Sequence, residues 1–276
     1  MPTLPEAADG FEWREVSWGA ALRCEPLARG ADHLFTTRPL ALPADPAAWA
    51  SLAEALGLPT SALVRLQQVH GADVFIRRRG DVRAPDTPCA DIVISDDPEL
   101  VLVVQAADCV PLLLADRQGR AVAAAHAGWR GAAAGVPAVA VHALAGAFGV
   151  PASDLVAAIG PSIGPCCYQV GPEVRAAFLA AGHAPAAVAR WFVSRGAAGS
   201  PAPGLHAQPD GPDRWQLDLQ RAVFDQLVAT GVPAAAVHTA GLCTAHHDRW
   251  LCSYRRDGAA AGRMAGAIRA GRTRGA

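Results

Sequence analysis

Short apolar segments follow one another closely through the first half of this chain, and they constrain its fold more than any other feature. They are rich in Val, Leu and Ile, and Gly, Asp or Pro residues bound them, which is typical of buried β-strands. These segments span residues 63–69, 72–76, 91–95, 100–105, 111–115 and 121–125. Further strands are expected over residues 11–18, 33–38, 155–159, 235–239 and 250–255.

Helical signals flank and interrupt these strands. Asp45 can cap a helix over residues 45–56, Pro46 suits its first turn, and Gly57 follows its end. Further helices are expected over residues 131–148, 172–181 and 213–230, with a long Gly- and Pro-rich loop over 196–213. Strands and helices do not alternate strictly, so the sequence predicts an α/β (α+β) fold in which helices pack on mixed β-sheets.

The composition indicates one folded unit. Apolar residues make up 51% and charged residues 18% of the 276 positions, which is globular rather than disordered composition. No internal repeat and no linker between separable parts is visible. We therefore expect residues 1–10 to form a loose N-terminal tail and residues 11–276 to form a single catalytic domain.

Charge and apolar patterning exclude several classes of partner. The formal net charge of −1 gives no overall field that would attract nucleic acid or anionic membrane. The start of the chain has no basic stretch followed by an apolar one, and apolar runs fall far short of the roughly 20 residues of a membrane helix. A cytoplasmic protein is expected, whose seven scattered Cys are thiols, ligands or core residues rather than disulfides.

Three features that lie at strand ends carry the chemically useful side chains. His70 ends an apolar strand and precedes Gly71. Cys109 follows Asp108 between two apolar strands, where it is a nucleophile, a metal ligand or a buried thiol. The third is the segment HAGWRG at residues 126–131, in which small residues let backbone approach a ligand.

Together, these three segments could form either of two kinds of site, a metal site or a nucleophilic one. His70, Cys109 and His126 supply two imidazoles and a thiolate, a set that binds zinc with a fourth position left open. In the alternative use, one histidine activates Cys109 as a nucleophilic thiolate. In either case, Arg130 and the start of the helix that follows it are candidates to hold an anion.

Other sites are less specific. Cys166 and Cys167 suggest metal or redox chemistry, but no histidine is near in sequence, so turn packing beside the pocket is expected. His246 and its neighbour His247 lie in a predicted surface loop, where a metal site is not expected. Asp108 is a candidate proton shuttle, or a partner that orients a ligand histidine.

Five ordered motifs resemble those of the YfiH family, also labelled laccase-domain proteins, polyphenol oxidases or peptidoglycan editing factors. The match runs from about residue 33 to about residue 268. The motifs are LQQVHG (66–71), ADCVPLLLAD (107–116), HAGWRG (126–131), IGPSIGPCCYQVG (159–171), and CT (243–244) followed by SYRRDG (253–258) and GRM (262–264).

This resemblance implies a function and a site. It implies one zinc ion per chain at His70, Cys109 and His126, on a fold of mixed sheets. It also implies phosphorolysis of adenosine, inosine, guanosine and methylthioadenosine, with adenosine deamination as a second activity. The expected partners are a nucleoside and phosphate, and the chain is expected to be a monomer or weak homodimer. The further site residues are expected to be catalytic Asp108 and Arg130, and substrate- or phosphate-binding Arg38, Gln68, Gly128 and Arg255.

Three other functions compete with this one. A peptidoglycan-precursor editing amidohydrolase would use the same zinc site. A copper polyphenol oxidase is disfavoured, because multicopper sites commonly need His-x-His pairs and the nine His of this chain form none. A scaffold that has lost activity is the third alternative. In members of the resembled family, a Gly- and Ser-rich loop and an Asn-Arg pair usually follow the strand that corresponds to residues 33–38, and this chain lacks both. We expect this shortened segment to leave the pocket more open and phosphorolysis slower.

Overall fold

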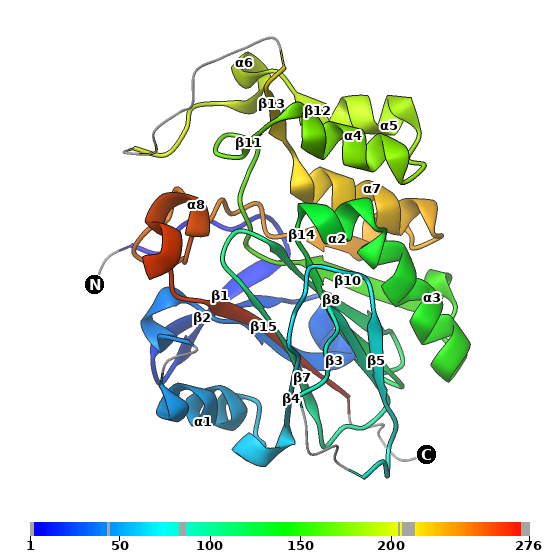
Figure 1. The fold of residues 1–276 in the computed structure, drawn as a ribbon. Coiled ribbons are helices and arrows are strands. Elements are labelled where there is room, and N and C mark those ends of the chain that lie inside the picture. Colours follow the sequence, from blue (N-terminus) through cyan, green and yellow to red (C-terminus); the bar gives the residue numbers. More distant parts are fainter. Residues whose placement is uncertain (1–2, 43–44, 83–86, 204, 206–212, 272–276) are drawn as a thin grey trace.

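Two six-stranded sheets packed face to face form the centre of the molecule (Figure 1). The structure is a computed structural model, and it describes residues 3–42, 45–82, 87–203, 205 and 213–271. The first sheet has the strand order β1-β2-β3-β15-β7-β4. Its strands are β1 (Phe11–Val16), β2 (Gly19–Cys24), β3 (Ala31–Phe35), β4 (Leu63–Arg65), β7 (Val101–Ala106) and β15 (Met264–Ala270).

The second sheet has the order β14-β10-β8-β9-β6-β5. Its strands are β5 (Val74–Arg77), β6 (Ile92–Ser95), β8 (Val110–Asp116), β9 (Val122–Ala127), β10 (Leu155–Ile159) and β14 (Val237–Thr239). A small third sheet is formed by β11 (Gln169–Val170), β12 (Phe192–Val193) and β13 (Trp215–Leu217).

Successive side chains along the strands of the second sheet pack into two different hydrophobic cores, one on each face of the sheet. On β8, Leu113 faces the first sheet, whereas Leu112 and Leu114 join the core beneath the helices. This period of two is the geometry of a strand, and burial of both faces explains why these strands read as continuous apolar runs. The predicted strands over 91–125 are confirmed within one or two residues.

Helices cover the outer faces. α1 (Pro46–Ala55) packs on the first sheet. The others are α2 (Trp129–Ala133), α3 (Val136–Phe148), α4 (Pro172–Ala180), α5 (Pro185–Trp191), α6 (Arg195–Ala198), α7 (Leu219–Ala229) and α8 (Tyr254–Asp257). Short 3-10 turns span Leu27–Arg29, Arg38–Leu40, Thr60–Ala62, Ala152–Asp154, Ala234–Ala236 and Gly258–Ala260. α3 and α7 lie on the second sheet, and α4, α5 and α6 gather with the third sheet at the top of the view (Figure 1).

The mixed fold class is confirmed. Strand pairs β4/β7, β5/β6 and β10/β14 are parallel, and the other pairs are antiparallel. Within the described residues, no helix has both the length and the apolar character needed to cross a membrane.

Several predicted elements are wrong in detail. The helix over 131–148 is two helices, because Gly135 between them has a left-handed φ of 80°. The helix over 213–230 begins only after Asp218, whose side chain accepts a hydrogen bond from the Arg221 N–H, and Trp215–Leu217 before it pair as a strand. Residues 250–255 form no strand but lead into α8. The loop predicted over 196–213 lies partly outside the described residues, and α6 occupies its beginning.

The N-terminal segment, expected to be a loose tail, makes several hydrogen bonds to the rest of the chain. The Trp250 indole N–H donates to the Thr3 carbonyl at 3.2 Å, and the Ala8 N–H donates to the Ala240 carbonyl at 3.1 Å. The Trp13 indole N–H donates to the Pro5 carbonyl at 2.7 Å.

Buried His33 on β3 makes stability depend on pH. Its Nε2 accepts a hydrogen bond from the Cys24 N–H at 2.9 Å, so the neutral ring is required, and burial lowers its pKa from 6.5 to about 4. The unfolded chain therefore binds a proton that the folded chain does not, between these two values. We expect the free energy of unfolding to fall by about 3 kcal/mol as the pH drops through this window. Denaturant titrations of the unchanged chain and of His33→Gln, which cannot ionise, will check this; equal acid slopes would contradict it.

Candidate metal site

The three predicted ligands come together at one end of the sheets. The ligand atoms of His70, Cys109 and His126 all lie within 4.8 Å of one another. The rings of His70 and His126 meet edge to face, with centroids 4.9 Å apart. His126 lies on β9 and is buried, Cys109 lies in the turn between β7 and β8, and His70 lies in the exposed turn before β5.

Two of the turns that place these ligands have unusual backbone. His70 has a φ of 61° and Asp108, next to Cys109, has a φ of 86°. Non-Gly residues rarely adopt this left-handed region, and such conformations persist where the surroundings hold them in place. The strain therefore coincides with the positions that aim the ligands.

Asp91, directly before β6, is the residue that holds the site together. Its Oδ1 accepts from Nδ1 of His126 at 2.8 Å and from the His70 N–H at 3.1 Å. Its Oδ2 accepts from the N–H groups of Gly71 at 2.7 Å and Val69 at 3.1 Å. Because Nδ1 of His126 donates to a carboxylate, its Nε2 is left to bind a metal.

The sequence did not point to Asp91; it offered Asp108 as a proton shuttle or as the partner that orients a ligand histidine. The second of these alternatives is wrong, because the carboxylate that accepts from His126 is that of Asp91. Asp108 accepts hydrogen bonds from the Thr244 hydroxyl and from the Arg255 N–H, each at 2.6 Å, so it ties the C-terminal segment to the β7–β8 turn. Burial raises the pKa of the Asp108 carboxyl. One feature of the sequence could have identified Asp91: it is a carboxylate that immediately precedes a wholly buried strand.

The electrostatics favour a thiolate at Cys109. Burial alone would raise the pKa of Cys109, but hydrogen bonds to His126 and then His70 outweigh it and bring the pKa down to about 7. Burial likewise opposes the charged form of His126, but hydrogen bonds to Asp91 and Cys109 raise its pKa to about 9. A thiolate that is available near neutral pH is either a metal ligand or a nucleophile.

Gly128 leaves the space in which the ligands sit. A Cβ atom on Gly128 would lie 2.9 Å from Cys109 Sγ and 3.2 Å from His70 Cδ2. No side chain fits there unless the ligands move, so Gly128 has a steric role.

The ligands open onto a cavity of about 660 Å³. Gln68 lines it, but both ends of its amide are bonded to the backbone of Gln105 at 2.8 Å, so it fixes the His70 segment to β7. The cavity is lined by Leu66, Gln68, His70, Gln105, Ala106, Ala107, Asp108, Cys109, His126, Tyr168, Tyr254, Arg255 and Arg263.

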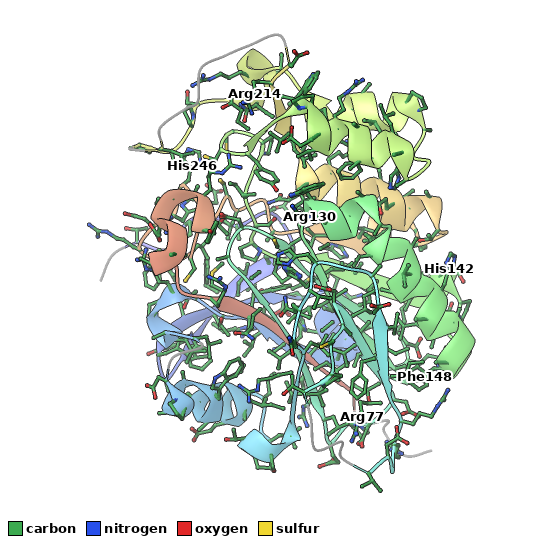
Figure 2. The ribbon with its side chains drawn as sticks, in the orientation of Figure 1. Arg77, Arg130, His142, Phe148, Arg214 and His246 are labelled. Carbon is green, nitrogen blue, oxygen red and sulfur yellow. The ribbon has the colours of Figure 1, made fainter. Side chains whose placement is uncertain are left out.

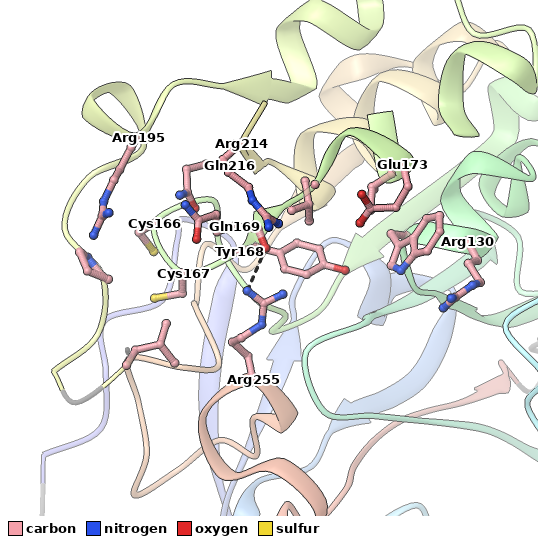
Figure 3. A pocket seen from close by; sticks show the side chains of 16 residues that line it. Arg130, Cys166, Cys167, Tyr168, Gln169, Glu173, Arg195, Arg214, Gln216 and Arg255 are labelled. Atoms are coloured by element: carbon pink, nitrogen blue, oxygen red, sulfur yellow. Dashed lines mark hydrogen bonds between the residues drawn. The ribbon is translucent and has the colours of Figure 1, made fainter. Parts of the chain in front are cut away.

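A second cavity of about 530 Å³ adjoins the first and shares Tyr168 and Arg255 with it. Arg130 lines this second cavity, with its guanidinium 4.3 Å from the Trp129 ring centroid. In Figure 3, Arg130 lies to the right of the Tyr168 ring and Arg255 lies below the ring. Arg255 also donates to the Gln169 carbonyl at 2.9 Å.

Arginines gather around this second cavity from several elements. Arg214 lies in the upper part of the molecule and Arg130 below it (Figure 2). Arg195 also lines the cavity, on the opposite side of Tyr168 from Arg130 (Figure 3). Arg38 lines neither cavity; its Nη1 donates to the Asp248 carbonyl at 2.8 Å and lies 3.4 Å from Asp257 Oδ2.

A histidine that is distant in the sequence lies beside Cys166 and Cys167, so the expectation that these two residues only pack a turn was incomplete. His246 Nδ1 lies 3.5 Å from Cys166 Sγ and 3.6 Å from Cys167 Sγ. The residues are about 80 positions apart in the chain, so no local motif could reveal this contact.

The donors at His70, Cys109 and His126 fit a catalytic zinc ion. Zinc binds His nitrogen and Cys sulfur, and a catalytic zinc site keeps three protein ligands and one open position; two imidazoles and a thiolate beside a cavity meet both requirements. In such sites a carboxylate commonly accepts a hydrogen bond from the ring nitrogen of the ligand histidine that does not bind the metal, as Asp91 does from His126.

Comparison with known proteins points to one family. The profile of the family described as multi-copper polyphenol oxidoreductase laccase matches residues 46–271. A protein of Pseudomonas aeruginosa named purine nucleoside phosphorylase is 40% identical over 191 residues, covering 69% of this chain and 67% of that protein. The purine nucleoside phosphorylase YfiH of Escherichia coli is 36% identical over 205 residues, covering 74% and 72%.

A solved structure agrees with these sequence matches. The crystal structure of YlmD from Geobacillus stearothermophilus matches with a TM-score of 0.78 at 30% identity, covering 94% of this chain and 99% of that one. The predicted family is confirmed: this chain belongs to the YfiH family of laccase-domain proteins.

Proposed function

We propose that this chain is a zinc-dependent purine nucleoside phosphorylase that acts on adenosine, inosine, guanosine and methylthioadenosine, with adenosine deamination as a side activity. The main support for this proposal is the position of His70, Cys109 and His126, which lie together at the wall of one cavity. A second cavity, lined by arginines, adjoins it. The names of the relatives support the phosphorolytic activity. Zinc, held by those three residues, would supply a Lewis acid.

The chain's own residues suggest how the two substrates are placed. Arg130 and Arg255 would hold phosphate by charge-assisted hydrogen bonds, with Arg255 reaching both cavities. A phosphate oxygen forms a bond to C1′ as the C1′–N9 bond breaks; the electron pair of that bond stays with the purine, which takes up the proton that the attacking hydrogen phosphate loses. The role of these arginines is positioning, which alone is worth many orders of magnitude in effective concentration.

The test is a nucleoside panel with and without phosphate, combined with metal analysis of the purified chain. Phosphorolysis gives ribose 1-phosphate and free purine only when phosphate is present, whereas deamination of adenosine gives inosine and ammonia without it. Absence of phosphate-dependent cleavage from the zinc-loaded chain would overturn the proposal. Copper with phenol oxidation in place of zinc would favour the activity named in the family profile.

Replacing Arg130 with Ala should raise the KM for phosphate by about 10- to 100-fold and leave the zinc content unchanged. The reason is loss of a charged donor from the second cavity, worth about 1.5–3 kcal/mol in a well-formed hydrogen bond. Arg78→Ala is the matched control, because Arg78 also stacks on an aromatic ring, that of Phe148 at 5.3 Å, but lines neither cavity. An equal phosphate KM in both variants would remove Arg130 from the phosphate site.

One observation favours the amidohydrolase as a second candidate. Arg130, Arg195, Arg214 and Arg255 all line the second cavity, which is larger than a single phosphate needs. A nucleotide-linked peptidoglycan precursor carries a diphosphate that such a cavity suits. Release of the amino acid from this precursor without phosphate would identify this activity.

A further inference from the structure

A second group of metal-binding side chains lies outside the site already described. Cys166 and Cys167 follow β10, and Cys243 and His246 follow β14, and their ligand atoms all lie within 4.8 Å of one another. Cys166 and Cys167 lie on the opposite side of Tyr168 from Arg130 (Figure 3). The four residues therefore form a cluster of three thiols and one imidazole beside the second cavity.

The separations agree with a tetrahedral ion. With zinc–sulfur bonds of about 2.3 Å and zinc–nitrogen bonds of about 2.0–2.1 Å, a tetrahedral angle places sulfur and nitrogen about 3.6 Å apart. Nδ1 of His246 lies 3.5 Å from Cys166 Sγ and 3.6 Å from Cys167 Sγ. His246 is thus already at ligand spacing from two of the sulfurs.

Backbone groups are arranged to support sulfur ligands. The Gly164 N–H donates to Cys243 Sγ at 3.3 Å, and the Ala202 N–H donates to Cys167 Sγ at 3.2 Å. Hydrogen bonds to a metal-bound thiolate stabilise its negative charge and fix its orientation. Apolar neighbours enclose the cluster, among them Ile163, Ala202 and Ala245.

We propose that Cys166, Cys167, Cys243 and His246 bind one structural zinc ion, separate from the ion at the His70 site and independent of the proposed activity. Four protein ligands close the coordination sphere, which distinguishes this site from the three-ligand site with its open position. Sulfur-rich tetrahedral donors select zinc over the hard cations. Binding releases the thiol protons, so no oxidant or reductant is needed.

The ion would join two segments that are distant in the chain. It would link the turn before β11 to the segment after β14, and Tyr168 follows Cys167 directly. Tyr168 lines both cavities, so the second ion would hold the partition between them. Its role is therefore to fix the shape of the two cavities, whatever ligand they bind.

Metal counting on the full chain, purified under reducing conditions and with zinc, tests the assignment. We expect two zinc ions per chain, one for each ligand group, and a single ion in either Cys243→Ser or Cys109→Ser. Cys89→Ser is the matched control: Cys89 is exposed and belongs to neither group, so this variant should keep both ions. A Cys243→Ser variant with as much zinc as the unchanged chain would overturn the proposal.

X-ray absorption supplies a measurement that does not depend on whether Cys243→Ser folds. The zinc ion retained by Cys109→Ser should have three sulfur neighbours and one nitrogen neighbour. A retained ion with nitrogen and oxygen neighbours only, copper in place of zinc, or a disulfide among Cys166, Cys167 and Cys243 found by mass spectrometry would each contradict the assignment.

Discussion

Replacing Asp91 with Asn should weaken zinc binding at the His70 site by about 10- to 100-fold, the range typical when an outer partner of a ligand histidine is lost. Asp91 accepts four hydrogen bonds, one from the ring of His126 and three from backbone N–H groups of the His70 turn. An amide can accept at only one of its two ends, so neither orientation of the Asn side chain preserves the set.

Each orientation of the Asn amide has a distinct cost. With its NH₂ group at the Oδ1 position, it donates to Nδ1 of His126, which forces the ring proton onto Nε2 and removes the metal-binding lone pair. With the NH₂ group at the Oδ2 position, it faces the N–H groups of Val69 and Gly71, which are also donors. The first outcome disables one ligand and the second releases the turn that carries another.

Competition with a chromophoric chelator at fixed pH measures this loss. Asp97→Asn is the control, because Asp97 lies beyond the opposite end of β6 and its Oδ1 accepts a local hydrogen bond from the Glu99 N–H at 2.9 Å. Thermal melting of both variants separates loss of metal from loss of fold. Zinc affinity that is unchanged in Asp91→Asn, or lowered equally in Asp97→Asn, would show that Asp91 does not position His126.

Elements that depend on local signals were the most predictable from the sequence. α1 begins and ends as expected because its signals are local: Asp45 Oδ1 accepts from the Ala47 N–H at 2.8 Å, Pro46 occupies the first turn, and Gly57 has a left-handed φ of 69°. The central strands of the second sheet, β6, β8, β9 and β10, were also found, because both of their faces are buried and their sequences are continuously apolar.

Elements that depend on distant pairing were missed. β15 is built mainly from Ala and Gly, which have weak strand propensity, and it is a strand because it pairs with β3 on one side and β7 on the other. β2 and α5 were also missed. The same reason applies to the sites: Asp91 is 35 residues from His126, and His246 is 80 residues from Cys166, so only the folded chain brings these partners together.

The last expectation concerns Gly128, whose missing side chain makes room for the ligands. Gly128→Ala should lower zinc affinity and nucleoside cleavage together, the latter by about 100-fold, since small misplacements near reacting groups cost that much. The backbone is not the cause, because the φ of −74° and ψ of 177° of Gly128 suit any residue. The added methyl group would lie 2.9 Å from Cys109 Sγ, closer than the two atoms can approach, so the thiolate must move.

Gly146→Ala separates this steric effect from a general effect of adding a methyl group. Gly146 lies inside α3, and a methyl group added to it would meet nothing within 4 Å, so its replacement should stabilise the helix by about 0.5–1 kcal/mol and leave zinc binding unchanged. Zinc titrations and steady-state kinetics on both variants make the comparison. If Gly128→Ala binds zinc and cleaves nucleosides as well as Gly146→Ala does, then the ligands tolerate displacement and the close packing around Cys109 does not limit function.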